Sequence, residues 1–354
     1  FSIYTSIKIY LIFVMISQNK ITFFFLPLHQ FIRRYIIEIM LGRRQLREKV
    51  MQNIYAYNCL GTEGEERMVE KNMMKSIDQI YDLYIYILNL IKVQKEIAEH
   101  RIQLAQSKNF PTQEDLNPNL KFVNNKVFRV LESNLELNRY SSDNKNLLWD
   151  VYDSYPNNIY KSLIESDLYK DYMKSGKNSF EEDQEFVLNF FVELIAEYDD
   201  LHDYLEGIQI TWADDVHIAN AMVHTTIKSF RESSSPLISL FKVYKDTDDK
   251  RFTEELFRKT IRHQSETKNM IDEKAQNWEL DRIATIDLII LEMALTEFLH
   301  FPNIPAKVTI NEYIELAKNY STEKSRVFVN GILDKTLKEL KDNNNLPKYG
   351  RGLL

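Results

Sequence analysis

The stretch IPAKVTINEYIELAKNYSTEKSRVFVNGILD, residues 304–334, decides the fold. It predicts two amphipathic helices joined by a short turn. Thr309 and Glu312 fit a capping box, with Val308 and Tyr313 at the positions of a hydrophobic staple, so we expect the first helix to begin here. Apolar residues then recur at i, i+3, i+4 and i+7, which predicts one buried stripe made of Ile310, Tyr313, Ile314 and Ala317.

The second helix of this stretch has its own start signal. Ser321 or Thr322 can cap it, and Glu323 falls in the first turn, where the helix dipole favours an anion. Its inner face is predicted to consist of Val329, Ile332, Leu333, Leu337 and Leu340. Gly331 interrupts the helical pattern, and a glycine there costs about 1 kcal/mol relative to alanine. We therefore expect a neighbouring helix to approach closely at Gly331.

A basic segment lies far upstream, in LGRRQLREKVMQNIYAY, residues 41–57. An apolar stripe at helical spacing predicts a packed helix: Leu46, Val50, Ile54 and Tyr57. Positive charge gathers at its start, where the helix dipole disfavours it: Arg43, Arg44, Arg47 and Lys49. An anionic partner would explain the cluster, and a solvated basic face is the alternative.

Three of these segments resemble the NusB family of transcription antitermination factors. The strings INEYIELAK (310–318) and FVNGILD (328–334) carry the resemblance, and the arginine-rich opening of the first helix is similar to that of the family. LEMALTE (291–297) is similar as well, although an arginine is more usual in the family at the position of Glu292. The resemblance implies an all-α fold of NusB-type helical bundles, enlarged here by an inserted or extended helical region.

The resemblance also implies a non-catalytic function. Such a protein binds boxA-type RNA with the ribosomal protein NusE and the transcription elongation complex, supporting ribosomal RNA transcription. Phosphates need Arg or Lys, and unpaired bases need flat side chains to stack on. We predict that two patches meet to bind RNA. The first contains Arg43, Arg44, Arg47 and Tyr55, and the second contains Tyr320, Lys324 and Phe328. The residues predicted to contact the protein partner are Asp281, Arg282 and Asp287.

Composition limits the alternatives. The 354 residues are 44% hydrophobic and 27% charged with eight Gly and eight Pro, which favours a helix-rich protein. A single cysteine, Cys59, excludes an intramolecular disulfide framework and a multi-cysteine zinc site, and it favours a cytoplasmic location. Because the net charge is −7, RNA binding has to be local rather than a property of the whole surface.

The chain is predicted to divide into five parts. Residues 1–39 are apolar, but Lys8, Lys20 and Arg33 leave no run of the ~20 residues that a membrane helix needs, so we expect no membrane insertion. We interpret this part as an upstream translated or disordered segment. The other parts are the first NusB-like helix at 40–60, a helical insertion at 61–248, the NusB-like core at 249–340 and a tail at 341–354. Within the insertion we predict helices at 72–106, 122–140, 143–152, 159–174, 180–206 and 212–232.

No motif for phosphate cradling, dinucleotide binding, a serine nucleophile or a zinc protease occurs in the chain. We therefore expect neither an enzyme nor a bound cofactor or metal. Carboxylate–histidine pairs at 199/202 and 214/217 have the i, i+3 spacing of helix-bundle metal sites, and we interpret them as a solvated acidic face. Two other functions stay open: a protein-interaction scaffold built on the insertion, and an RNA-binding module related to RNA cytosine methyltransferases.

Overall fold

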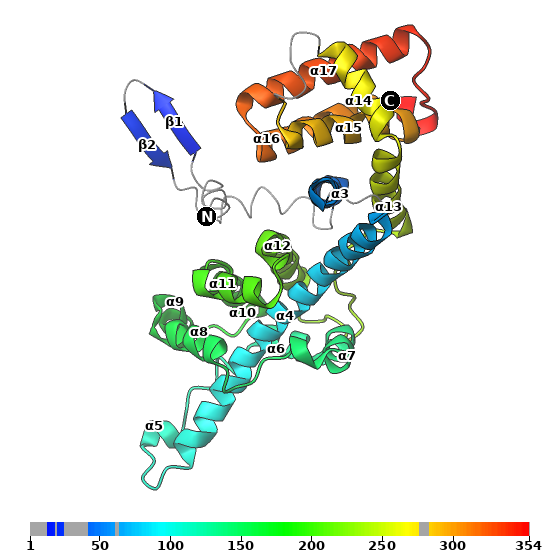
Figure 1. Cartoon of the computed structure of the whole chain (residues 1–354). Coiled ribbons are helices and arrows are strands. Elements are labelled where there is room, and N and C mark those ends of the chain that lie inside the picture. The colour runs from blue at the N-terminus through cyan, green and yellow to red at the C-terminus, as the bar shows by residue number, and fades with distance from the viewer. Residues whose placement is uncertain (1–12, 18–19, 25–41, 61–63, 276–282, 354) are drawn as a thin grey trace. The chain divides into compact units, whose positions relative to one another are not determined.

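The computed structural model describes residues 13–17, 20–24, 42–60, 64–275 and 283–353 (Figure 1). All but two of their secondary-structure elements are helices, which confirms the predicted all-α class. The exception is an antiparallel pair of strands, β1 (Phe13–Ser17) and β2 (Lys20–Phe24), in which Phe13 faces Phe24 and Ser17 faces Lys20. No helix in the described ranges is long and apolar enough to cross a membrane.

The chain divides into two compact units. The middle unit contains Ile80–Phe241 together with Phe1–Ile39, and the split unit combines Met40–Gln79 with Lys242–Leu354. Helix α4 (Glu66–Gln106) contributes its first turns to the split unit and its remainder to the middle unit. The five-part division made from the sequence stays a prediction.

In the middle unit, shorter helices gather around the long apolar side of α4 (Figure 1). The long helix predicted at 72–106 is confirmed. Two predicted helices, 122–140 and 159–174, each split in two, because Asn134 and Ser166 accept hydrogen bonds from the N–H groups of Leu137 and Tyr169 and start new helices. The helices are α5 (Gln113–Leu116), α6 (Lys126–Ser133), α7 (Leu135–Asp143), α8 (Ser154–Glu165), α9 (Asp167–Lys174), α10 (Phe180–Phe191), α11 (Asp199–Ile208) and α12 (Trp212–Ser229).

Two further predictions for the middle unit are wrong. Residues 143–152 form a single 3₁₀ turn, η2 (Lys145–Leu147), instead of a helix. The helix predicted at 180–206 is interrupted by a π-helical turn, η3 (Val192–Ala196), after which the extended backbone of Tyr198 precedes α11.

The split unit is a bundle centred on α15 (Thr285–His300). This helix packs against α3 (Arg43–Leu60), α13 (Thr247–Arg262), α14 (Gln264–Lys274), α16 (Ala306–Tyr320) and α17 (Glu323–Asp342). Its sequence is apolar over most of its circumference, which is typical of a helix at the centre of a bundle, and the structure buries it on several sides. A short 3₁₀ turn, η5 (Gly350–Leu353), ends the described chain.

The start of α17 agrees with the sequence analysis. The Thr322 hydroxyl accepts a hydrogen bond of 3.2 Å from the N–H of Ser325, and Glu323 occupies the first turn. The predicted inner face is buried at all five of its positions. Local capping chemistry therefore places this helix correctly.

The start of α16 and the role of Gly331 differ from the predictions. Helix α16 begins at Ala306, directly after the extended residue Pro305, so Thr309 lies inside the helix and the capping-box prediction is wrong. A methyl group placed on Gly331 would have no neighbour within 4 Å, so the predicted close approach of another helix is also wrong.

Candidate nucleic-acid interface

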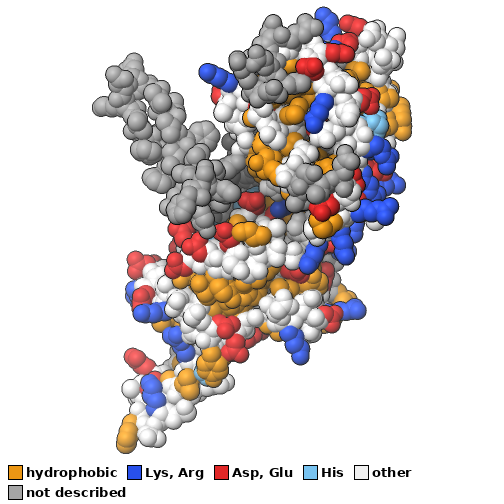
Figure 2. Space-filling view, in the orientation of Figure 1, with side chains coloured by type: hydrophobic (Ala, Val, Ile, Leu, Met, Phe, Trp, Pro, Cys, Tyr) orange, Lys and Arg blue, Asp and Glu red, His pale blue; other side chains and the backbone are white. Residues whose placement is uncertain are grey.

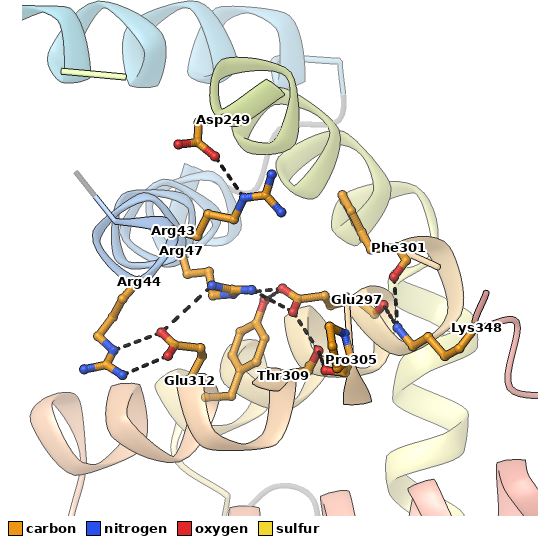
Figure 3. A network of polar contacts seen from close by, with 11 residues as sticks. Arg43, Arg44, Arg47, Asp249, Glu297, Phe301, Pro305, Thr309, Glu312 and Lys348 are labelled. Atoms are coloured by element: carbon orange, nitrogen blue, oxygen red, sulfur yellow. Dashed lines mark hydrogen bonds and ion pairs between the residues drawn. The ribbon is translucent and has the colours of Figure 1, made fainter. Parts of the chain in front are cut away.

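The arginines at the start of α3 face carboxylates on three other helices (Figure 3). Arg43 donates from Nε to Oδ1 of Asp249 on α13, at 2.9 Å. Arg44 makes a two-pronged contact with Glu312 on α16, Nε to Oε2 at 2.9 Å and Nη2 to Oε1 at 2.8 Å. These carboxylates are anionic partners within the protein. They offset part of the positive charge that the helix dipole disfavours at the start of α3.

Arg47 forms the centre of this network (Figure 3). Its Nε and Nη2 donate to the two carboxylate oxygens of Glu297, each at 2.8 Å, and the two side chains are 2% and 0% exposed. Burial opposes the charged form, but the Glu297 carboxylate outweighs it and raises the pKa of Arg47 above its ordinary value. The guanidinium therefore stays charged inside the bundle.

Glu297 collects two further donors from α16. The Thr309 hydroxyl donates to Oε1 at 2.7 Å, and the Tyr313 hydroxyl donates to Oε2 at 3.2 Å. Burial and the adjacent carboxylate both raise the pKa of Tyr313, so its phenol keeps the proton that it donates. A buried carboxylate with this set of donors satisfies the rule that buried charges need both a counter-ion and hydrogen bonds.

Lys348, near the C-terminus, is hydrogen-bonded to the end of α15, the helix that carries Glu297. Lys348 Nζ donates to the backbone oxygens of Glu297 and Phe301, at 3.1 and 2.9 Å (Figure 3). Burial lowers the pKa of Lys348 to about 8. These bonds satisfy two carbonyl groups near the C-terminal end of α15, where a cation is favoured by the helix dipole.

The four RNA-facing residues predicted on α3 have different environments. Arg43 and Arg44 keep 41% and 37% of their side chains exposed, and Tyr55 is 42% exposed. Arg47, at 2% exposure, has no guanidinium surface for a phosphate, because Glu297 and the rings of Phe252 and Tyr313 surround it. The structure thus places three of the four side chains at the surface and gives Arg47 a structural role.

The three residues of the second predicted RNA patch lie in two different places. Tyr320 donates from its hydroxyl to Glu48 and accepts a 3.4 Å hydrogen bond from Gln52 Nε2, which places it beside the middle of α3. Lys324 is exposed and Phe328 is partly exposed; both line a groove of about 430 Å³ whose other wall includes Lys274 of α14. The structure therefore brings Tyr320 to α3 and places Lys324 and Phe328 along the α14–α17 groove.

A groove of about 450 Å³ adjoins Arg43. Lys259, His300 and the exposed Tyr349 line it, together with Arg251. The cations of this groove are paired: Arg251 lies 3.0 Å from Asp248, and Lys259 lies 2.9 Å from Glu255. A phosphate entering here would compete with carboxylates that are themselves on the surface.

Exposed arginines on α13 were missed by the sequence analysis. Arg251, Arg258 and Arg262 share the solvent face of this helix, and Figure 2 shows Lys and Arg side chains gathered on the side where α13 lies. Their spacing, i, i+7 and i+11, was the signal that could have found them. Arg258 and Arg262 line a groove of about 760 Å³ with Arg67 and Lys71 of α4, in which Glu70 accepts a 2.9 Å hydrogen bond from Arg258.

Of the residues predicted to contact the protein partner, Asp281 and Arg282 lie outside the described residues. Asp287 is 3% exposed in the first turn of α15, where a carboxylate is favoured by the helix dipole. Its burial leaves little surface for a partner. The set of site residues remains a prediction.

Comparisons with known proteins support the family resemblance. The NusB family model matches residues 215–338. The transcription antitermination protein NusB of Salinibacter ruber is 44% identical over 125 residues, which are 35% of this chain and 78% of that protein. The NusB proteins of Chloroherpeton thalassium and Methylacidiphilum infernorum are 44% and 43% identical over 112 and 94 residues, covering 32% and 27% of this chain and 53% and 66% of theirs.

A solved structure of T. maritima NusB is 37% identical, covers 28% of this chain and 72% of that chain, and superposes with a TM-score of 0.27. The family match begins at residue 215, inside the predicted insertion, and does not include residues 40–60. Those residues nevertheless form α3, which packs against α13, α15 and α16. With 44% identity over 78% of the Salinibacter ruber protein, the chain belongs to the NusB family.

Proposed function

We propose that this protein is a transcription antitermination factor. It binds boxA-type RNA in nascent transcripts together with the ribosomal protein NusE, within the elongation complex, and supports ribosomal RNA transcription. The observation that carries the proposal is the 44% identity to a protein named as a transcription antitermination factor, over 78% of that protein. The proposed role is non-catalytic and cytoplasmic.

The start of α3 is the proposed RNA face. Arg43 and Arg44 keep about two-fifths of their side chains exposed while they contact Asp249 and Glu312. A guanidinium at the surface can meet a phosphate through two parallel N–H groups, which makes an arginine suited to this contact. Tyr55, 42% exposed further along the same helix, offers a ring on which a base can stack.

The buried network supports this face without touching RNA. Arg47 and Glu297 join α3 to α15, and Glu312 holds Arg44 against α16. These contacts fix the direction in which the start of α3 presents Arg43 and Arg44. In this proposal Arg47 is a positioning residue, and RNA contacts come from Arg43, Arg44, Tyr55, Tyr320, Lys324 and Phe328.

RNA binding by the full-length chain tests the proposal. A labelled RNA containing boxA and a scrambled RNA of equal length are titrated with the protein, with and without NusE. We expect boxA to bind at least about tenfold more tightly than the scrambled RNA, with a further gain when NusE is present. Equal affinity for the two RNAs in both conditions would contradict the proposed function.

A further inference from the structure

Three side chains that can ligate a metal meet at one corner of the split unit. His263 lies between the last residue of α13 and the first residue of α14, Glu266 lies in the first turn of α14, and His300 is the last residue of α15. In the part of the chain that the structure describes, this is the group of three such side chains that lie close enough together to share an ion.

The geometry of the three side chains is compact. One ligand atom from each residue can be chosen so that all lie within 4.8 Å of one another. His263 Nδ1 is 3.1 Å from Glu266 Oε2, and the rings of His263 and His300 stack with centroids 4.0 Å apart. With His263 28% exposed and Glu266 55% exposed, an ion can reach the cluster from solvent.

A second observation comes from His300. Its Nε2 is buried and has no hydrogen-bond partner among the described residues. A ring nitrogen without a hydrogen-bond partner, on a ring that stacks against a second histidine, is an arrangement that a bound cation would satisfy.

One cation is close to this cluster. Lys259 donates from Nζ to the backbone oxygen of His300, at 3.2 Å. The same ammonium group lies 2.9 Å from Glu255 and 4.7 Å from the centre of the Phe301 ring. Its charge is therefore already engaged by a carboxylate and an aromatic face, which reduces its repulsion of a metal ion.

We propose that His263, Glu266 and His300 bind one divalent transition-metal ion, with Zn²⁺ as the ion of choice. Two neutral imidazoles and a carboxylate form a three-ligand set typical of zinc sites that keep one position open to water. Binding requires the three donor atoms to close to roughly 3.3 Å from one another, which rotation of the His263 and Glu266 side chains brings about. The ion links the α13–α14 corner to the end of α15.

Zinc titration of the full-length, untagged chain after treatment with a chelator tests the site. Calorimetry should show one tight site per chain. His263→Ala and His300→Ala should each weaken it by about 100-fold or more, and Glu266→Gln by about tenfold. His100→Ala is the matched control, because that histidine lies on α4 in the middle unit and contacts Tyr152; it should leave zinc binding unchanged.

A parent protein without a tight zinc site, or a His300→Ala variant that binds zinc as the parent does, would overturn the assignment. Circular dichroism shows whether the alanine variants fold. If the alanine variants do not fold, the parent and Glu266→Gln are titrated with Co²⁺ instead. The visible absorption of Co²⁺ bound by these three ligands should appear in the parent and change in the variant. An unchanged spectrum would also overturn the assignment.

Discussion

Arg47 and Glu297, 250 positions apart in the sequence, face each other through two hydrogen bonds of 2.8 Å in a fully buried site. The first helix of the split unit is thereby joined to its central helix. Thr309 and Tyr313 of α16 donate to the same carboxylate, so one glutamate connects three helices. This network explains why a cluster of arginines stands at a helix start, where the dipole disfavours it.

Breaking this pair should destabilise the split unit strongly. Arg47→Met leaves the Glu297 carboxylate buried without its counter-ion, and we expect a loss of about 3–5 kcal/mol in the free energy of unfolding. Urea denaturation followed by circular dichroism measures it. Glu297→Gln should cost a comparable amount, and the double variant should lose less than the sum of the two, because the two residues interact directly.

Arg43→Met is the control for the Arg47 variant. Its ion pair with Asp249 is 41% exposed on the arginine side, so its loss should cost no more than about 1 kcal/mol. Equal losses for Arg43→Met and Arg47→Met would show that the buried pair has no special weight.

Thr309 is predicted to act through its contact with Glu297 and not as a helix cap. Thr309→Val keeps the shape of the side chain but removes the 2.7 Å hydrogen bond to a buried carboxylate, at a cost of about 1.5–3 kcal/mol. Thr309→Ser keeps the hydroxyl and should recover most of that loss in the same denaturation assay.

Thr322→Ala tests the true cap. It removes the acceptor for the N–H of Ser325 and should cost about 1 kcal/mol. Thr322→Asn should retain most of the parent stability. A Thr322→Ala variant as stable as the parent would show that α17 is held by packing alone.

Glu292 should make stability depend on pH. Burial raises the pKa of this carboxyl from 4.5 to about 7, against smaller opposing effects of Gln264 and Lys268. Between these values the folded state keeps a proton that the unfolded state has released, so the free energy of unfolding falls as pH rises through this range. Glu292→Gln removes the effect and should gain about 1–3 kcal/mol over the parent at pH 8.

The comparison at low pH completes this test. At pH 4, where the carboxyl is protonated in the folded state, Glu292→Gln and the parent should have similar stability. Glu315→Gln, at a partly exposed position of α16, is the matched control; because it keeps Glu292, its free energy of unfolding should change between the two pH values as that of the parent does. A constant offset between Glu292→Gln and the parent at both pH values would contradict the assignment.

Local signals in the sequence were sufficient to predict a helix whose start and buried face are determined by its own residues. Thr322, Glu323 and the apolar stripe of α17 were predicted correctly because a cap, a dipole and a period act within a few residues. The burial of α15 on several sides also followed from its composition. Asn134 and Ser166 carried equally local signals, but they stand within apolar patterns that continue on both sides.

The polar residues of the candidate site could not be predicted in the same way. Thr309 and Glu312 have the spacing of a capping box, yet they do not contact each other's backbone as a cap would. Thr309 donates a hydrogen bond to Glu297 on another helix, and Glu312 accepts hydrogen bonds from Arg44, which is far away in the sequence. The exposed and buried arginines of α3 look alike in the sequence. The position of a carboxylate on another helix decides which one is buried, and periodicity does not contain that information.

Salt dependence should report how many cations contact RNA. If Arg43, Arg44 and Lys324 each neutralise one phosphate of single-stranded RNA, the logarithm of the affinity should fall with the logarithm of salt concentration with a slope of roughly −2. Arg43→Gln with Arg44→Gln should reduce that slope by roughly 1.4. Fluorescence anisotropy over a series of KCl concentrations gives both values, and a slope near zero for the parent would exclude phosphate contacts as the basis of binding.

The central claim is that the start of α3 binds RNA while its buried arginine holds the fold. The most direct test is the boxA RNA affinity of two double variants of the full-length chain. Arg43→Gln/Arg44→Gln removes the cations, and Asp249→Asn/Glu312→Gln removes the carboxylates that contact them, so both variants lose the Arg43–Asp249 and Arg44–Glu312 ion pairs, and the second also loses the 3.9 Å contact between Glu312 and Arg47. We predict at least tenfold weaker binding for the first and binding equal to or tighter than the parent for the second. Equal affinity of both variants for boxA RNA would contradict the claim.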